Sequence, residues 1–309
     1  MRSGTLRFMI RRLVFLWILV ALPLSAATFK ADDGTPLYYD TLGKDGKVVV
    51  LLSGGPGFSP AYIQAIGERL AVRYQVVVFH QRGTGRSKME KITFETHALK
   101  TLVADLESLR RDLKVEKFTL LGHSFGGILS MFYASEHPDR LDALVLVDSG
   151  GPTLATVPKF ITNLNARLTD EDNAKVKEWS DPAKMKANHA QAILEITRAK
   201  TPAYFADREK GKAFADTLGE ESFNDAVFYA ITPQLMAGLD LRESLKKVTA
   251  PVLVIHGKQD PLESADEVHA TFPQSELVVI DNAGHFPWVE QPDTFYKALG
   301  AFLLKVIKR

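Results

Sequence analysis

The sequence predicts a doubly wound, mostly parallel α/β sheet with an inserted helical cap. Three observations favour this fold class: short continuous apolar runs rich in β-branched residues, helical patterns between those runs, and one long helix-prone stretch with no clear strand. Continuous apolar runs are typical of strands buried on both faces of a parallel sheet. Their alternation with helical patterns indicates βαβ units.

The first element is a short hairpin over residues 29–42, with its turn at Asp32-Asp33-Gly34. Apolar runs closed by turns then predict the strands of the sheet core: residues 48–52, 75–79, 118–121, 143–147, 252–255 and 277–280. Helical patterns lie between them or after them: residues 61–72, 96–113, 125–136, 265–271 and 293–307.

Residues 152–245 interrupt this alternation. The stretch is charged and helix-prone, and it contains candidate helices at 154–168, 172–179, 183–199, 204–218 and 223–236. An insertion of this length between two strands is typical of a cap. We therefore divide the chain into a core of residues 28–151 and 246–309 and a cap of residues 152–245.

Composition excludes several classes of protein. The chain has 309 residues, a net charge of +1, 46% hydrophobic residues and 24% charged residues, which is the balance of a globular protein with a large core. Near-neutral charge gives no reason to expect nucleic acid as a partner. The absence of cysteine excludes disulfides, thiol nucleophiles and cysteine-ligated metals. No metal-binding signature occurs, and we expect neither a metal nor a cofactor.

The N-terminus has the pattern of a secretory signal. A basic region with four arginines precedes an apolar run over residues 13–24, and Ser25-Ala26-Ala27 supplies small residues for cleavage. The run is short for crossing about 30 Å of hydrocarbon. We expect cleavage near Ala27, a periplasmic or secreted protein, and no stable membrane partner afterwards. An uncleaved membrane anchor is the alternative.

Ser124 is the expected nucleophile. It lies in Gly122-His123-Ser124-Phe125-Gly126, between a predicted strand and a predicted helix. A serine in such a sharp strand-to-helix turn adopts a strained conformation and needs small neighbours, which Gly122 and Gly126 provide. The turn raises the hydroxyl above the edge of the sheet, where a general base can reach it.

A base and an acid are expected late in the chain. His285 directly follows the last predicted strand and would serve as general base and then general acid. Asp260 follows the preceding strand and would hold the imidazole in the correct tautomer. Both positions lie at the carboxyl edge of the sheet, where active sites of open parallel sheets are found. Asp148, at the end of the strand over residues 143–147, is the second candidate for the acid.

An oxyanion hole would complete the chemistry, because backbone N–H groups stabilise the charge of a tetrahedral intermediate. One donor is expected to be the amide of Phe125, directly after the nucleophile. The other is expected in the glycine-rich loop Ser53-Gly54-Gly55-Pro56-Gly57. Proline has no N–H group, so Gly55 is the first candidate and Gly54 the second.

Four motifs together resemble the prolyl iminopeptidase-like branch of the α/β hydrolases: Ser-Gly-Gly-Pro-Gly at 53–57, Gln-Arg-Gly-Thr-Gly-Arg-Ser at 81–87, Gly-His-Ser-Phe-Gly-Gly at 122–127 and Gly-His-Phe-Pro-Trp at 284–288. The resemblance covers about residues 29–151 and 240–305. It implies an α/β-hydrolase fold with a cap between two strands, a Ser124, Asp260 and His285 triad, and Gly55 and Phe125 as oxyanion donors. It also implies removal of N-terminal residues from short peptides.

The chain departs from the pattern of this branch at three places. Ser53 stands where the family loop usually has histidine, and His80 stands where an aspartate is usual. Peptidase members bind the free amine of the substrate with cap glutamates, which no motif locates here.

Our weaker pocket candidates are Gly54, Phe58, Trp288, Glu220 and Glu221, while core packing is an equal explanation for the aromatic residues. Asp225 is another acid near that pair, and Arg82 and Arg86 are expected to stabilise their loop.

Three functions remain open. The first is an aminopeptidase acting on short peptides through an acyl-enzyme, and the second is a carboxylesterase acting on small esters. The third is a ligand-binding protein that keeps the fold without turnover. The substrate is therefore expected to be a small molecule or a short peptide. The sequence does not indicate an oligomeric state.

Overall fold

A computed structural model describes residues 25–44 and 46–307 of the chain. Residues 1–24 of the expected signal segment lie outside the described residues, while its last three, Ser25, Ala26 and Ala27, begin the first strand. Within the part described, no helix combines the length and apolarity needed to cross a membrane.

The centre of the molecule is an eight-stranded sheet in the order β1-β2-β4-β3-β5-β6-β7-β8. β1 pairs with β2 and β2 with β4 in antiparallel fashion, and all other neighbours are parallel. The strands are β1 (Ser25–Lys30), β2 (Pro36–Leu42), β3 (Val48–Leu52), β4 (Gln75–His80), β5 (Phe118–His123), β6 (Leu141–Val147), β7 (Val252–Gly257) and β8 (Glu276–Ile280).

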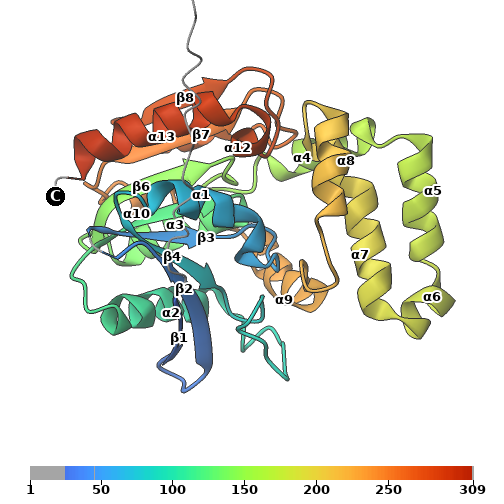
Figure 1. The fold of residues 1–309 in the computed structure, drawn as a ribbon, viewed down its shortest axis with the longest axis horizontal. Coiled ribbons are helices and arrows are strands. Elements are labelled where there is room, and N and C mark those ends of the chain that lie inside the picture. The colour runs from blue at the N-terminus through green and yellow to red at the C-terminus, as the bar shows by residue number, and fades with distance from the viewer. Residues whose placement is uncertain (1–24, 45, 308–309) are drawn as a thin grey trace, which may run out of the picture.

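Helices cover both faces of this sheet, as Figure 1 shows. One buried apolar cluster joins the sheet to α2 (Leu99–Asp112), α3 (Phe125–Glu136), α9 (Asp225–Met236), α10 (Arg242–Leu245) and α11 (Ala265–Thr271). The opposite cluster joins it to η1 (Pro60–Ile63), α1 (Gln64–Leu70), α12 (Pro287–Glu290) and α13 (Pro292–Val306). β3 is buried at all five positions, as expected for a strand covered on both faces.

The regular elements between β6 and β7 are all helices. They are α4 (Val157–Arg167), α5 (Asp170–Trp179), α6 (Pro182–Ala187), α7 (His189–Lys200), η2 (Thr201–Tyr204) and α8 (Arg208–Asp216), followed by α9 and α10. Helices α4 to α8 project from one side of the sheet core (Figure 1). Val227, Ile231 and Leu235 of α9 instead belong to the core cluster, so the C-terminal part of the insertion packs with the core.

The predicted fold class is confirmed, and most elements lie within a few residues of their expected positions. The strand over residues 48–52 and the helices over 125–136 and 265–271 have the predicted bounds. The cap differs more. The single helix expected over 183–199 is two helices, because Asn188 is extended and its side chain caps the N-terminus of α7.

Candidate active site

The functional candidates gather where the parallel strands end. Leu52 of β3 pairs with Gly122 of β5, and Gly122 pairs with Leu146 of β6, so these strands end at one level. The loops after them carry the glycine-rich segment 53–57, Ser124 and Asp148. The loops after β7 and β8 carry Asp260 and His285 at the same edge. Parallel topology thus brings together residues more than 200 positions apart in the chain.

Ser124 lies in the turn between β5 and α3 with a φ of 56°, in the left-handed region that a residue other than glycine rarely adopts. A Cβ atom at Gly122 would overlap the carbonyl oxygen of Gly126, and one at Gly126 would overlap that of Leu52. Glycine is therefore required at both positions, as the sequence predicts. Ser124 is partly exposed, whereas His123 and Phe125 on either side are buried.

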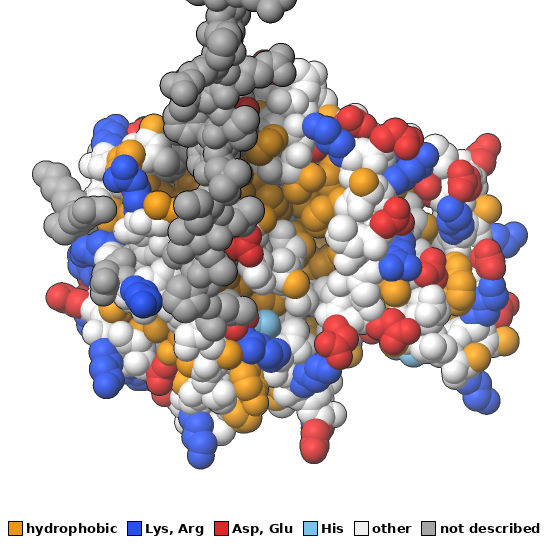
Figure 2. Space-filling model, viewed as in Figure 1, with side chains coloured by type: hydrophobic (Ala, Val, Ile, Leu, Met, Phe, Trp, Pro, Cys, Tyr) orange, Lys and Arg blue, Asp and Glu red, His pale blue; other side chains and the backbone are white. Residues whose placement is uncertain are grey.

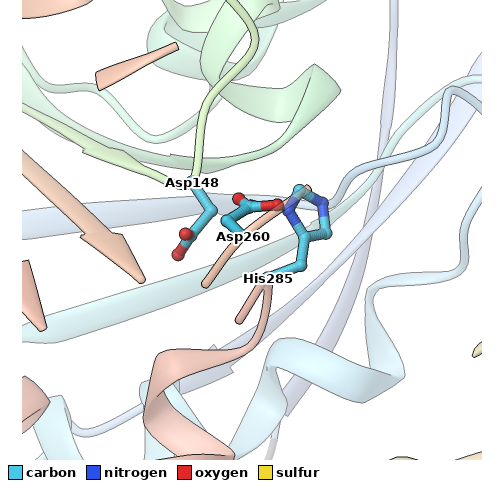
Figure 3. Close-up of side chains that lie close together, drawn as sticks. All are labelled: Asp148, Asp260 and His285. Carbon is cyan, nitrogen blue, oxygen red and sulfur yellow. Dashed lines mark hydrogen bonds and ion pairs between the residues drawn. The ribbon is translucent and has the colours of Figure 1, made fainter. Parts of the chain in front are cut away.

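His285 and Asp260 are in direct contact. Nδ1 of His285 lies 2.8 Å from Oδ2 of Asp260, and both side chains are buried (Figure 3). The other oxygen of Asp260 accepts a hydrogen bond of 2.8 Å from the Leu262 amide. These contacts hold the carboxylate against the imidazole, which is the arrangement that fixes the tautomer of a catalytic histidine.

Among the described residues, no hydrogen bond joins Ser124 to His285. The ring of His285 lies 4.6 Å from the ring of His123, the residue before Ser124. In the part of the chain that the structure describes, the Ser124 hydroxyl makes no hydrogen bond, and none of the contacts of His285 reaches it. Such catalytic contacts are often long before substrate binds and tighten in the substrate complex.

Asp148, the second candidate for the acid, is fully buried beside Asp260 (Figure 3). Its Oδ1 accepts a hydrogen bond of 2.8 Å from the Gly257 amide, and its Oδ2 has no hydrogen-bond partner. Of the two aspartates, Asp260 is the one hydrogen-bonded to His285. This geometry favours Asp260 over Asp148 as the acid.

Burial controls protonation in this cluster. Burial raises the pKa of Asp148, and the neighbouring Asp260 raises it further. Burial also raises the pKa of Asp260, while hydrogen bonds to its carboxylate oppose that shift. Since Asp260 accepts two hydrogen bonds and one oxygen of Asp148 has none, the proton shared by the pair belongs on Asp148. Burial lowers the pKa of His285, so its imidazole is neutral and able to accept a proton at neutral pH.

Polar atoms of Asp148, Asp260 and His285 lie within 4.8 Å of one another, a spacing that a metal ion could also use. However, both oxygens of Asp260 and Nδ1 of His285 are already used in hydrogen bonds. The hydrogen bond between His285 and Asp260 therefore accounts for this spacing without a metal ion.

The glycine-rich loop lies against the nucleophile. A Cβ atom at Gly54 would lie 2.8 Å from the Cβ of Ser124, so only glycine lets the loop approach so closely. The Gly54 amide donates a hydrogen bond of 2.7 Å to the hydroxyl of Tyr62. Within the described residues, the amides of Gly55 and Phe125 have no hydrogen-bond partner. Gly54 is thus occupied as a donor, while Gly55 and Phe125 remain free, which favours the expected oxyanion pair.

The departures from the family pattern have structural explanations. The Ser53 hydroxyl donates to the Phe58 carbonyl at 2.7 Å and accepts from Gln81 at 2.9 Å, so serine still anchors the loop. His80 contacts Asp40 at 3.0 Å. Arg82 is buried and paired with Asp105. Arg86 pairs with Asp40, so both arginines stabilise their loop as expected.

The weaker pocket candidates lie in different surroundings. Phe58 packs against Phe223 with ring centroids 4.8 Å apart, and Trp288 is buried within an aromatic cluster around Tyr62. Glu220 and Glu221 are exposed, and Glu221 forms an ion pair with Lys88. Asp225 likewise contacts His189. No contact links these acids to Ser124 in the described part of the chain, so their role in the pocket stays a prediction.

Apolar side chains gather between the core and the cap on the face drawn in Figure 2, whereas charged side chains cover the outer surface of the cap. Aromatic rings from both parts meet beside His285: Tyr204 and Phe214 from the cap, and Phe286 from the loop after β8. The surroundings of the site are therefore largely apolar.

Three residues at the site were missed by sequence reasoning. Tyr62 bonds to the Gly54 amide, the Tyr204 carbonyl accepts from the His285 amide at 2.8 Å, and Glu290 accepts from the amides of Asp207 and Gly284. None lies in a motif, and the contacts of Tyr204 with His285 and of Glu290 with Asp207 join segments about 80 residues apart. A Gly-x-Ser-x-Gly pattern carries no signal for such partners.

A family model described as the alpha/beta hydrolase fold matches residues 47–292. Curated relatives include a proline iminopeptidase from Xylella fastidiosa, 27% identical over 82% of this chain and 88% of its own length. Another is a proline iminopeptidase from Arabidopsis thaliana, 26% identical over 85% of this chain and 75% of its own.

Similar solved structures include a proline iminopeptidase-related protein from Thermus thermophilus, with a TM-score of 0.70, 24% identity, and coverage of 93% of this chain and 99% of that one. An esterase from Exiguobacterium antarcticum has a TM-score of 0.66, 22% identity, and coverage of 90% and 98%. At these identities the structures support the fold alone.

Proposed function

Because the chain belongs to the α/β hydrolase fold family, we propose that it is a serine hydrolase acting through an acyl-enzyme, with Ser124 as nucleophile, His285 as general base and Asp260 as acid. The observation that carries the proposal is the buried Asp260–His285 pair beside a strained, accessible serine. That arrangement can deprotonate a serine hydroxyl and stabilise the imidazolium that results.

The steps follow from the geometry. His285 takes the proton of the Ser124 hydroxyl while the Ser124 oxygen attacks the carbonyl carbon of the substrate. The amides of Gly55 and Phe125 donate hydrogen bonds to the developing oxyanion. His285 then gives the proton to the leaving group, and the C–N or C–O bond breaks. Water, deprotonated by His285, then attacks the acyl carbon. The bond from that carbon to the Ser124 oxygen breaks, His285 returns its proton to Ser124, and the acid is released.

For the substrate, we propose the N-terminal residue of short peptides, as in a proline iminopeptidase-like aminopeptidase. The support is that several curated relatives carry this name and align over most of the chain. Small esters are the second candidate class. The apolar, aromatic surroundings of His285 and the lack of contact between Ser124 and the cap acids Glu220 and Glu221 favour it.

A substrate panel separates these candidates. We expect turnover of aminoacyl-naphthylamides, with the proline derivative among the better substrates. A kcat/KM for p-nitrophenyl acetate or butyrate that exceeds every aminoacyl derivative would instead assign an esterase. Absence of turnover on the whole panel would support the third alternative, a ligand-binding protein.

We also propose export from the cytoplasm, supported by the arginine-rich region, apolar run and small residues of the first 27 positions. Mass spectrometry of the protein made with its full N-terminus in a bacterial host tests this. A mature N-terminus near Thr28 in the periplasmic fraction is expected. An intact N-terminus in the cytoplasm would contradict it.

A further inference from the structure

A chain of three hydrogen bonds connects the separate parts of the site. The Gly54 amide donates to the Tyr62 hydroxyl at 2.7 Å, and that hydroxyl lies 2.7 Å from Nδ1 of His123. Nε2 of His123 lies 2.9 Å from the carbonyl oxygen of His285. The chain therefore runs from the glycine-rich loop, past the residue before Ser124, to the backbone of the proposed base.

The direction of every proton in this chain is determined. The Gly54 amide can only donate, and the His285 carbonyl can only accept. His123 must therefore carry its proton on Nε2, and its Nδ1 must accept the hydroxyl proton of Tyr62. Burial lowers the pKa of His123 well below its ordinary value and raises that of Tyr62, so both side chains are neutral at neutral pH.

The first hydrogen bond also affects which amide of the loop is free. Tyr62 occupies the Gly54 amide, and the Phe58 amide donates to the Gly54 carbonyl at 3.3 Å. In a trans peptide the C=O and N–H groups point in opposite directions. The Gly55 amide, which shares its peptide with the Gly54 carbonyl, therefore points away from Phe58 and stays available to a substrate.

We propose that Tyr62 and His123 are positioning residues: their hydrogen-bonded chain fixes the oxyanion loop and the loop of His285 relative to Ser124. This inference rests on the proposed function, since it concerns the same site. Neither side chain need touch the substrate. Errors of about 1 Å in the position of catalytic groups can lower turnover about 100-fold, so a hydrogen bond that orients them affects the rate without affecting binding.

The Tyr62 ring also packs against other aromatic rings, independently of the hydrogen bonds of its hydroxyl. The ring contacts the aromatic rings of His123, Phe286, Trp288 and Phe214, with centroids 5.5 to 6.4 Å away. Phenylalanine would keep these ring contacts and remove only the hydroxyl. Tyr62→Phe therefore isolates the hydrogen-bonded chain from the aromatic packing.

The first experiment compares Tyr62→Phe with Tyr133→Phe on the best substrate of the panel. Tyr133 is the matched control, because its ring is buried and its hydroxyl donates to Glu107 at 2.8 Å, in a contact outside the site. Titration with a fluorophosphonate counts folded sites, so kcat is expressed per active site. We expect kcat to fall about 10–100-fold in Tyr62→Phe, with KM within about twofold of wild type, and to stay unchanged in Tyr133→Phe.

The second experiment is a double-mutant cycle of Tyr62→Phe with His123→Asn. Asparagine can still accept the Tyr62 hydroxyl proton but is too short to reach the His285 carbonyl. If the residues act as one chain, the double variant loses little more kcat than the more affected single variant.

Two outcomes overturn the inference while the wild type remains active. In the first, Tyr62→Phe and Tyr133→Phe have the same kcat per active site. In the second, the loss of kcat in the double variant equals the product of the losses in the two single variants. A wild type that neither turns over the panel nor reacts with the fluorophosphonate would instead overturn the proposed function, and the inference with it.

Discussion

The sheet core and the projecting cap are held together in different ways. Strands β3, β5 and β7 of the core are buried at every position, and the core contains a buried ion pair between Arg82 and Asp105. Helices α4 and α6 of the cap bury no residue at all, and α5 buries only Asp172. These outer helices are held by capping side chains and surface ion pairs, whereas α7 and α8 bury apolar residues closer to the core. Packing is therefore densest in the sheet and decreases toward the tip of the cap.

The two regions nevertheless meet at the catalytic loops. The Tyr204 carbonyl of the cap accepts from the His285 amide, and Arg167 at the end of α4 donates to the carbonyl of Gln259, beside Asp260, at 2.6 Å. Changes that affect the base of the cap should therefore alter activity more than changes at its tip. The predictions below test this contrast, beginning with the largest effect.

Replacing the proposed catalytic residues should remove activity and leave the core folded. We expect His285→Ala and Asp260→Asn each to lower kcat by about 10⁴-fold, because proton transfer or the tautomer is lost. Steady-state kinetics measures this, with circular dichroism as the control for folding. An inactive Asp148→Asn together with an active Asp260→Asn would show that the acid is assigned to the wrong aspartate.

Breaking the buried ion pair should destabilise the core strongly. Asp105→Ala leaves the buried Arg82 guanidinium without its bidentate partner, and we expect a loss of about 3–5 kcal/mol in the free energy of unfolding. Asp142→Ala is the matched control, because it removes a surface pair with Lys47 worth about 1 kcal/mol or less. Similar losses in urea unfolding of the two variants would contradict this account of the core.

A substitution at the tip of the cap should have a small and local effect. Asp181 accepts hydrogen bonds from the amides of Ala183 and Lys184 at the start of α6, and Asp181→Ala should cost about 1 kcal/mol. Faster amide hydrogen exchange confined to α6, with unchanged kcat, is the expected result. A clear decrease in kcat would mean that the tip of the cap is coupled to the site.

The pH dependence should show the effect of burial on the base. Since burial lowers the pKa of His285, its neutral form persists below the ordinary histidine value of about 6.5. Activity should therefore remain constant from neutral pH to below pH 6.5 and fall only at lower pH. The pH profile of kcat/KM measures this limb, and a midpoint at or above 6.5 would contradict the burial argument.

The same contrast explains which features the sequence reveals. Core strands such as residues 48–52 are continuous apolar runs, and glycine at 122 is required by the Gly126 carbonyl four positions later, so these features can be predicted from nearby residues. The break at Asn188 depends on a single capping side chain. The contacts of Tyr62 with His123 and of Tyr204 with His285 depend on the tertiary packing of distant segments, which leaves no local pattern in the sequence.

The central claim is that Ser124 is a nucleophile activated by His285. The most direct measurement is the intact mass of wild type, Ser124→Ala and His285→Ala after incubation with a fluorophosphonate. The account predicts one adduct on wild type, none on Ser124→Ala, and strongly slowed labelling of His285→Ala. An adduct of the same stoichiometry on Ser124→Ala, or an unmodified wild type, would contradict it.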